Sequence, residues 1–170
     1  IGSTGIKSDS GDIDLEVDDR AISKQQLAQV LKDWCKSNGL DDRDHVRKTG
    51  ISVHFKAPIQ GVEREFVQVD FMFGETEWMK WALRGVPESS KYKAVHRQVL
   101  MASIAKYNGL KWSTENGLLS RETGREITKD PSSIAKYLLG PGHRAKDLDS
   151  VESIMKAISK YDDREKMIEE

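Results

Sequence analysis

Residues 10–18 read SGDIDLEVD, and this stretch decides the fold of the first half of the chain. Acidic and aliphatic residues alternate along it with a period of two, which is typical of a half-buried β-strand. Because residues i and i+2 of a strand point to the same face, Asp12 and Asp14 project side by side. The aliphatic residues that alternate with them, Ile13 and Leu15, are expected to enter a core.

The residues after this strand predict one amphipathic helix and a pair of strands. Ser23 followed by Gln26 has the spacing of a capping box, and apolar residues then recur at helical spacing, so a helix is expected over residues 23–38. Two runs rich in β-branched and aromatic residues follow, at 51–55 and 65–73. They predict a hairpin with a long turn.

The second half of the sequence is expected to be mostly helical. Apolar periodicity predicts four helices, at residues 76–84, at 90–107, from Asp130-Pro131 onward, and from Val151 to Tyr161. In the helix at 90–107, the expected buried stripe consists of Val95, Val99, Leu100, Ile104 and Tyr107. Turn-forming pairs within residues 110–127 favour turns and a small hairpin. The sequence therefore predicts a core at residues 1–88 and a mostly helical accessory region at residues 89–170.

The composition restricts the classes of partner and compartment. The 170 residues include 27 Lys+Arg and 28 Asp+Glu, and a formal net charge of −1 argues against a purely electrostatic nucleic-acid binder. The single cysteine, Cys35, permits no internal disulfide, which favours a reducing compartment. Neither a long apolar run nor a signal peptide is found, so we expect a soluble cytoplasmic protein with no membrane partner.

A third carboxylate, Asp70, lies within the run at 65–73, between apolar neighbours. If this strand lies beside residues 12–18, the carboxylates of Asp12, Asp14 and Asp70 converge. Carboxylates this close repel one another unless a cation lies between them. Oxygen ligands suit Mg²⁺ or Mn²⁺, and two such ions roughly 3.5–4 Å apart stabilise both the attacking and the leaving oxygen of a phosphoryl displacement.

In these motifs the sequence resembles the DNA polymerase β-like nucleotidyltransferase superfamily, which includes poly(A) polymerases and minimal nucleotidyltransferases. The shared pattern is Gly-Ser, then Asp-x-Asp between aliphatic residues, then a carboxylate on a later strand. Here it reads Gly2-Ser3, Asp12-Ile13-Asp14 and Asp70, and the resemblance covers residues 1–75. Members of the family carry a helix and a strand ahead of the Gly-Ser loop. The sequence is therefore expected to be a fragment, a processed form or an atypical member.

The resemblance implies an α+β nucleotidyltransferase fold, with a short mixed β-sheet backed by helices and a mostly helical C-terminal region. It implies that Asp12 and Asp14 bind both metal ions, and that Asp70 binds the catalytic ion and can help to deprotonate the attacking hydroxyl. Gly2 and Ser3 would contact the phosphates of a nucleoside triphosphate such as ATP. Lys7, in the same loop, is a candidate for the triphosphate or an ordinary surface lysine.

The activity that the resemblance implies is metal-dependent transfer of a nucleoside monophosphate from an NTP to an acceptor hydroxyl, with release of pyrophosphate. The acceptor stays open among nucleic acid, a small molecule and protein. One alternative is a catalytically inactive binding module of the same fold. Another is a minimal nucleotidyltransferase of a toxin–antitoxin type system that adds the nucleotide to a protein.

Basic residues begin the helix predicted at 90–107. In relatives a basic side chain from a downstream helix touches the triphosphate, but a solvated surface is the interpretation we favour for Lys91, Lys93, His96 and Arg97. The four histidines of the chain show no metal-ligand spacing. No chemistry is assigned to them.

Overall fold

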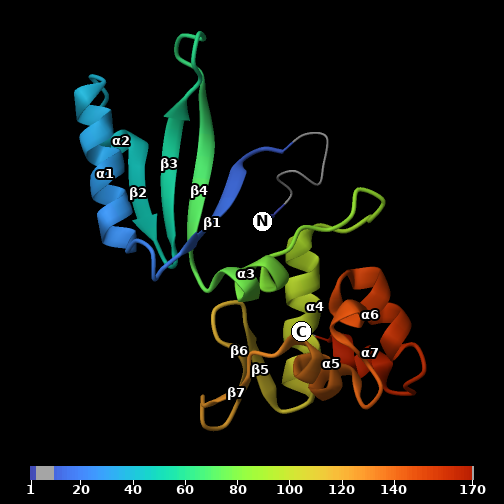
Figure 1. Ribbon diagram of the computed structural model, residues 1–170. Helices are drawn as coiled ribbons and strands as arrows, with labels where there is room; N and C mark the ends of the chain where they lie inside the picture. Colours follow the sequence, from blue (N-terminus) through green and yellow to red (C-terminus); the bar gives the residue numbers. More distant parts are fainter. Residues whose placement is uncertain (3–9, 170) are drawn as a thin grey trace. The chain divides into compact units, whose positions relative to one another are not determined.

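The computed structural model describes residues 1–2 and 10–169 (Figure 1). They form two compact units, residues 1–80 and 81–170. The division falls within the helix α3 (Thr76–Ala82), whereas the sequence places a boundary after residue 88. The first unit contains a mixed sheet and helices, so the predicted α+β class is confirmed.

The first unit is built on a four-stranded sheet with the strand order β1-β4-β3-β2. β1 runs parallel to β4, while β3 pairs antiparallel with both β4 and β2. The strands span Ile13–Asp18 (β1), Val46–Thr49 (β2), Ser52–Pro58 (β3) and Phe66–Gly74 (β4). The predicted first strand and the predicted hairpin are confirmed. The short strand β2 was not predicted, because its sequence VRKT lacks apolar alternation.

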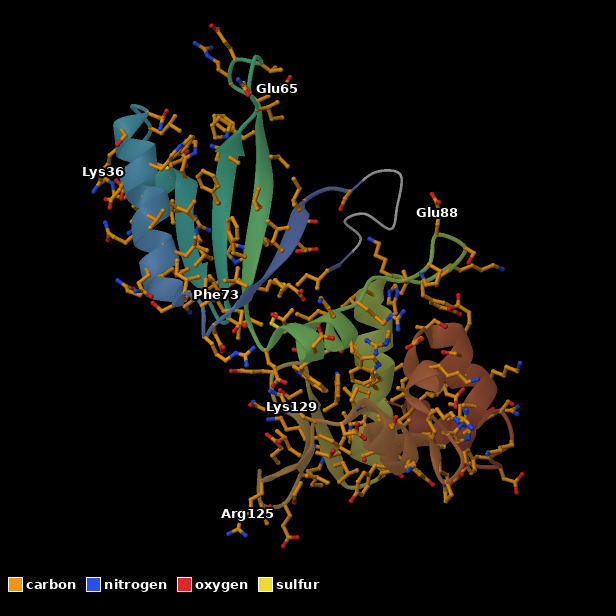
Figure 2. All side chains as sticks on the ribbon, viewed as in Figure 1. Lys36, Glu65, Phe73, Glu88, Arg125 and Lys129 are labelled. Carbon is orange, nitrogen blue, oxygen red and sulfur yellow. The ribbon has the colours of Figure 1, made fainter. Side chains whose placement is uncertain are left out.

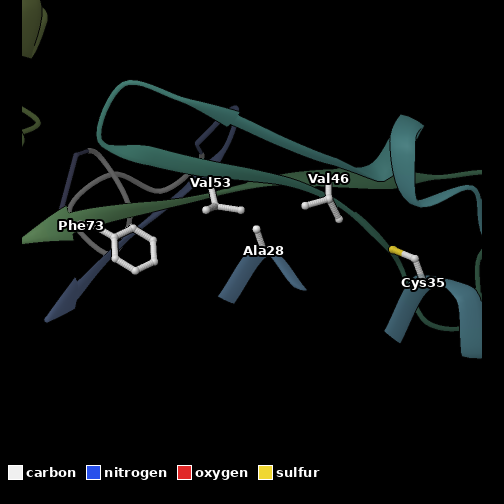
Figure 3. Close-up of a cluster of buried hydrophobic side chains, with 5 residues drawn as sticks. All are labelled: Ala28, Cys35, Val46, Val53 and Phe73. Carbon is white, nitrogen blue, oxygen red and sulfur yellow. The ribbon is translucent and has the colours of Figure 1, made fainter. Parts of the chain in front are cut away.

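The helix α1 (Lys24–Ser37) packs on one face of this sheet, and the short helix α2 (Asp42–His45) leads from it to β2 (Figure 1). The capping box predicted for α1 is confirmed, because Gln26 N donates to Ser23 Oγ and Ser23 N donates to Gln26 Oε1. Figure 3 shows the buried cluster between helix and sheet, which consists of Ala28, Cys35, Val46, Val53 and Phe73.

The prediction that Leu15 enters the core is wrong, because 41% of this residue remains exposed. β1 is an edge strand, and the apolar cluster under α1 reaches it at Val17. The alternation of β1 nevertheless holds. Its aliphatic side chains point to one face of the sheet and its acidic side chains to the other.

The second unit combines helices with a small antiparallel sheet. The helices are α4 (Ala94–Tyr107), α5 (Pro131–Leu139), the 3₁₀ helix η1 (Ala145–Leu148), α6 (Val151–Ile158) and α7 (Arg164–Ile168). The sheet has the order β5-β6-β7, with strands Leu110–Ser113, Gly117–Ser120 and Glu126–Thr128, where turns and a small hairpin were predicted. Among the described helices, none combines the length and the apolar character that a bilayer crossing requires.

Two helix starts in the second unit test the sequence signals. The predicted start of α5 is confirmed, because Ser133 N donates to Asp130 Oδ2 over 2.7 Å. The helix α4 begins at Ala94, later than the predicted residue 90. Ser90 does not cap it, since its hydroxyl donates to Glu152 Oε1 instead.

Arg97 is fully buried, so the expected solvated position for this residue is wrong. Its Nε donates to Leu148 O and its Nη1 to Ala82 O, and the guanidinium carbon lies 5.1 Å from the centre of the Trp81 ring. Burial lowers the pKa of the guanidinium to about 10, and the charge of Arg84 acts in the same direction. Arg97 is therefore part of the core of the second unit.

Candidate metal centre

The carboxylates of Asp12, Asp14 and Asp70 converge at the parallel pairing of β1 with β4. Asp14 lies directly opposite Asp70 in the register of the two strands. Asp12 precedes β1 and is two residues from Asp14, so it shares the same face of the sheet. One carboxylate oxygen from each residue lies within 4.8 Å of the other two. The predicted convergence of these three side chains is present.

The electrostatics of this cluster favour a bound cation. Partial burial raises the pKa of the Asp14 carboxyl above its ordinary value, and the neighbouring carboxylates of Asp12 and Asp70 raise it further. A divalent cation among these oxygens would offset both the burial of the Asp14 charge and the repulsion between the carboxylates. The donor set contains only carboxylate oxygens, which is the chemistry that Mg²⁺ and Mn²⁺ prefer. The residues present therefore fit such an ion.

Gly2 lies against this cluster. Its backbone has a φ of +62°, and a Cβ atom built on it would fall 2.0 Å from Asp14 Oδ2. Any other residue at this position would displace the carboxylate or the backbone, so glycine allows the chain to approach Asp14. Ser3 and Lys7, the other two residues predicted to contact the triphosphate, lie outside the described residues.

Two side chains that the sequence did not single out hold Asp70. His54 Nδ1 lies 2.6 Å from Asp70 Oδ1, and Gln68 Nε2 lies 3.0 Å from both Asp70 oxygens. Because a carboxylate only accepts, Nδ1 of His54 carries the proton in this contact. Its Nε2 faces the hydroxyl of Thr49 at 2.5 Å and can accept from it. The carboxylate of Asp70 is thus oriented by its own strand and by the strand beside it.

The register extends this arrangement across all four strands. Asp14, Asp70, His54 and Arg47 are consecutive partners on β1, β4, β3 and β2. Since the alternate residues of these strands pack against α1, this row belongs to the opposite face. We call the strand side chains directed away from α1 the polar face.

A pocket of about 540 Å³ opens on the polar face next to Asp70. Its lining includes His54 and Gln68, the two residues that bind Asp70, together with Arg47, Thr49, Lys56 and Phe66. Asp44 and His45 of α2 also line it. The metal candidate and this pocket therefore share two side chains.

The place of His54 opposite Asp70 follows from the β3–β4 register. His54 alternates with Val53 and Phe55, so the sequence indicates its face, but not the residue of β4 that lies opposite.

The chain matches no protein-family model and no curated protein. The function of this centre is therefore inferred from the chemistry of its own residues.

Proposed function

We propose that this chain is a metal-dependent nucleotidyltransferase with the fold that its sequence motifs resemble. The observation that carries the proposal is the convergence of Asp12, Asp14 and Asp70 at the β1–β4 pairing. A cluster of carboxylates alone is common on protein surfaces. Here it coincides with the Gly-Ser and Asp-x-Asp motifs, and with a glycine backbone that lies against Asp14.

In the proposed site, Asp12, Asp14 and Asp70 hold one or two Mg²⁺ or Mn²⁺ ions. Such ions would neutralise charge on the triphosphate and on the attacking and leaving oxygens. Phosphoryl transfer requires little covalent chemistry from the protein, so the protein contributes mainly position and charge. His54 and Gln68 contribute by fixing the orientation of the Asp70 carboxylate.

The reaction that we propose breaks a phosphoanhydride bond of the NTP and forms a phosphoester bond to the acceptor. The acceptor hydroxyl oxygen bonds to the α-phosphorus of the NTP, while the bond from that phosphorus to the bridging oxygen breaks. Pyrophosphate leaves with the electron pair of that bond, and Asp70 takes the proton of the hydroxyl. The backbone of Gly2 and the side chains of Ser3 and Lys7 are assigned to the triphosphate.

Binding and transfer should be measured on the same variants. Wild type should bind Mg²⁺–ATP in calorimetry and should transfer label from an α-³²P NTP to an acceptor hydroxyl. Because metal ions supply several kcal/mol of stabilisation in such reactions, Asp70→Asn should lower transfer at least about a hundredfold. Asp19→Asn is the matched control, since Asp19 lies just after β1 and outside the cluster.

The results separate the alternatives. Undiminished transfer by Asp70→Asn or Asp14→Asn would refute the assignment. Metal-dependent binding of ATP without transfer to nucleic acid, small molecules or protein would identify a binding module instead. Label on a protein alone would favour the protein-modifying alternative.

A further inference from the structure

The pocket beside Asp70 has a composition suited to an anionic and aromatic ligand. Lys56 and Arg47 are its two lysine and arginine side chains, and Asp44 is its one carboxylate. Asp44 is already bound by Lys56, with 2.9 Å between Nζ and Oδ2. Within the described residues Arg47 makes no ion pair, so its charge is available to a ligand.

The pocket also offers an aromatic surface. Phe66 is 37% exposed at the start of β4, and Lys56 Nζ lies 4.6 Å from the centre of its ring. Exposed aromatic rings beside cations are the usual platform for unpaired nucleobases. The pocket volume of about 540 Å³ is within the ordinary range for small-ligand sites.

The order of the strands places this pocket on one side of the candidate metal centre. Gly2, assigned to the triphosphate, lies against Asp14 on the edge strand β1. The pocket is lined by α2, β2, β3 and the first residues of β4, and no residue of β1 lines it. In phosphoryl transfer the attacking and leaving oxygens are roughly in line. If pyrophosphate leaves on the β1 side, the acceptor must approach from the side of the pocket.

We infer that this pocket binds the acceptor, and that the acceptor is the 3′ end of a single-stranded nucleic acid. The inference rests on the proposed function. The terminal 3′-hydroxyl faces Asp70, a backbone phosphate lies at Arg47 and an unpaired base stacks on Phe66. Arg47 is two strands from Asp70, about 10 Å at ordinary strand spacing. That separation is within the reach of one or two nucleotides.

The transfer step then has a defined acceptor atom. The 3′-oxygen of the strand bonds to the α-phosphorus, the bond to the bridging oxygen breaks, and pyrophosphate leaves with its electron pair. The hydroxyl proton passes to Asp70. The charge of Arg47, which no ion pair offsets within the described residues, disfavours a cationic small-molecule acceptor.

The inference is tested by the binding of fluorescein-labelled RNA and DNA octamers, measured by fluorescence anisotropy. Arg47→Ala should raise the Kd about tenfold and reduce the salt dependence of binding by about one phosphate contact. Phe66→Leu keeps apolar bulk but removes the ring, and should raise the Kd at least about fivefold. Lys36→Ala is the control, because Lys36 is an exposed lysine on α1 (Figure 2), and it should leave the Kd unchanged.

Mg²⁺–ATP affinity of the same variants distinguishes failure of this inference from failure of the proposed function. If wild type binds Mg²⁺–ATP but Arg47→Ala and Lys36→Ala bind the octamers equally, the acceptor assignment is overturned and the proposed function stands. If Arg47→Ala weakens ATP rather than octamer binding, the pocket holds the donor nucleotide and the inference is also overturned. If wild type binds none of the four nucleoside triphosphates in the presence of Mg²⁺, both fail.

Discussion

His54 Nδ1 lies 2.6 Å from Asp70 Oδ1, and the two residues are direct partners across the β3–β4 pairing. The side chain of Asp70 is only 13% exposed, and that of His54 31%. The N–H of an imidazole fixes the carboxylate in this way, while one of its oxygens stays within 4.8 Å of carboxylate oxygens of Asp12 and Asp14. His54 is therefore a positioning residue for the candidate metal ligand.

Loss of this positioning should weaken metal binding. We expect His54→Ala to lower the affinity for Mn²⁺ about tenfold, since partners of metal ligands commonly contribute at that level. His54→Asn keeps a donor near the place of Nδ1 and should recover most of the affinity. Electron paramagnetic resonance of free Mn²⁺ measures both without an activity assay. Equal affinities of His54→Ala and wild type would exclude a positioning role.

The sequence predicted the carboxylates but not their supporting residues, for a reason of register. Alternation along residues 10–18 and 65–73 assigns Asp12, Asp14 and Asp70 to faces of strands. The pairing of His54 with Asp70 depends on how many residues the β3–β4 connection, residues 59–65, places between the strands. The composition of this connection does not determine the register of the two strands. The partner of Asp70 is therefore known only from the structure.

The helix α4 shows a similar limit in the second unit. The predicted buried stripe included Val95 and Val99, which are 57% and 42% exposed. Ile104 is buried as predicted, but the helix also buries Arg97 and Met101, which the prediction did not include. Apolar periodicity identifies a helix well. A polar residue can nevertheless lie on the buried side of the helix when backbone carbonyls accept its hydrogen bonds. Hydrophobicity alone then predicts the wrong buried face.

Arg97 should be important for the stability of the second unit. Truncation in Arg97→Ala removes a fully buried side chain and the hydrogen bond to Leu148 O, so we expect a loss of about 3 kcal/mol in the free energy of unfolding. Arg121 also donates through Nε to a carbonyl, Leu110 O, but is exposed. Arg121→Ala should stay within about 0.5 kcal/mol of wild type.

Urea unfolding followed by circular dichroism compares these two variants directly. Arg97→Met, which keeps apolar bulk and removes the buried charge, should be less destabilised than Arg97→Ala. If Arg97→Ala and Arg121→Ala unfold at the same urea concentration, the buried guanidinium contributes nothing to stability.

Gly2 should be required for metal binding because it has no side chain, which leaves space for the carboxylate of Asp14. In Gly2→Ala the new methyl group would meet Asp14 Oδ2, and the carboxylate would have to turn away from the cluster. Gly39 is the matched control, because its φ is also positive, at +71°, and no atom lies within 4 Å of an added Cβ. Both variants should lose about 1 kcal/mol of stability from backbone strain. Only Gly2→Ala should lose Mn²⁺ affinity.

Isothermal titration with Mn²⁺ separates the two glycine variants. A Gly2→Ala protein that binds Mn²⁺ as wild type does would show that the carboxylate of Asp14 needs no glycine beside it. A loss of affinity in Gly39→Ala would point to a general effect of stability instead.

The raised pKa of Asp14 predicts how metal-free stability changes with pH. The folded protein holds the Asp14 proton more tightly than the unfolded chain does, because burial and the carboxylates of Asp12 and Asp70 disfavour its charge. The contribution of Asp14 to stability therefore falls as pH rises from about 4, the ordinary carboxyl range, through the raised pKa. Above that pKa the full cost of the charge is present.

Asp14→Asn removes this charge and should have a higher melting temperature than wild type near pH 7 in EDTA. The difference should vanish toward pH 4 and grow as pH rises, because only wild type loses the proton. Mg²⁺ should reverse the order, raising the melting temperature of wild type by stabilising the ionised carboxylates while leaving Asp14→Asn nearly unchanged. Asp19→Asn, outside the cluster, should follow wild type in both conditions. A wild-type melting temperature that Mg²⁺ does not move at pH 7 would count against a metal ion at these three carboxylates.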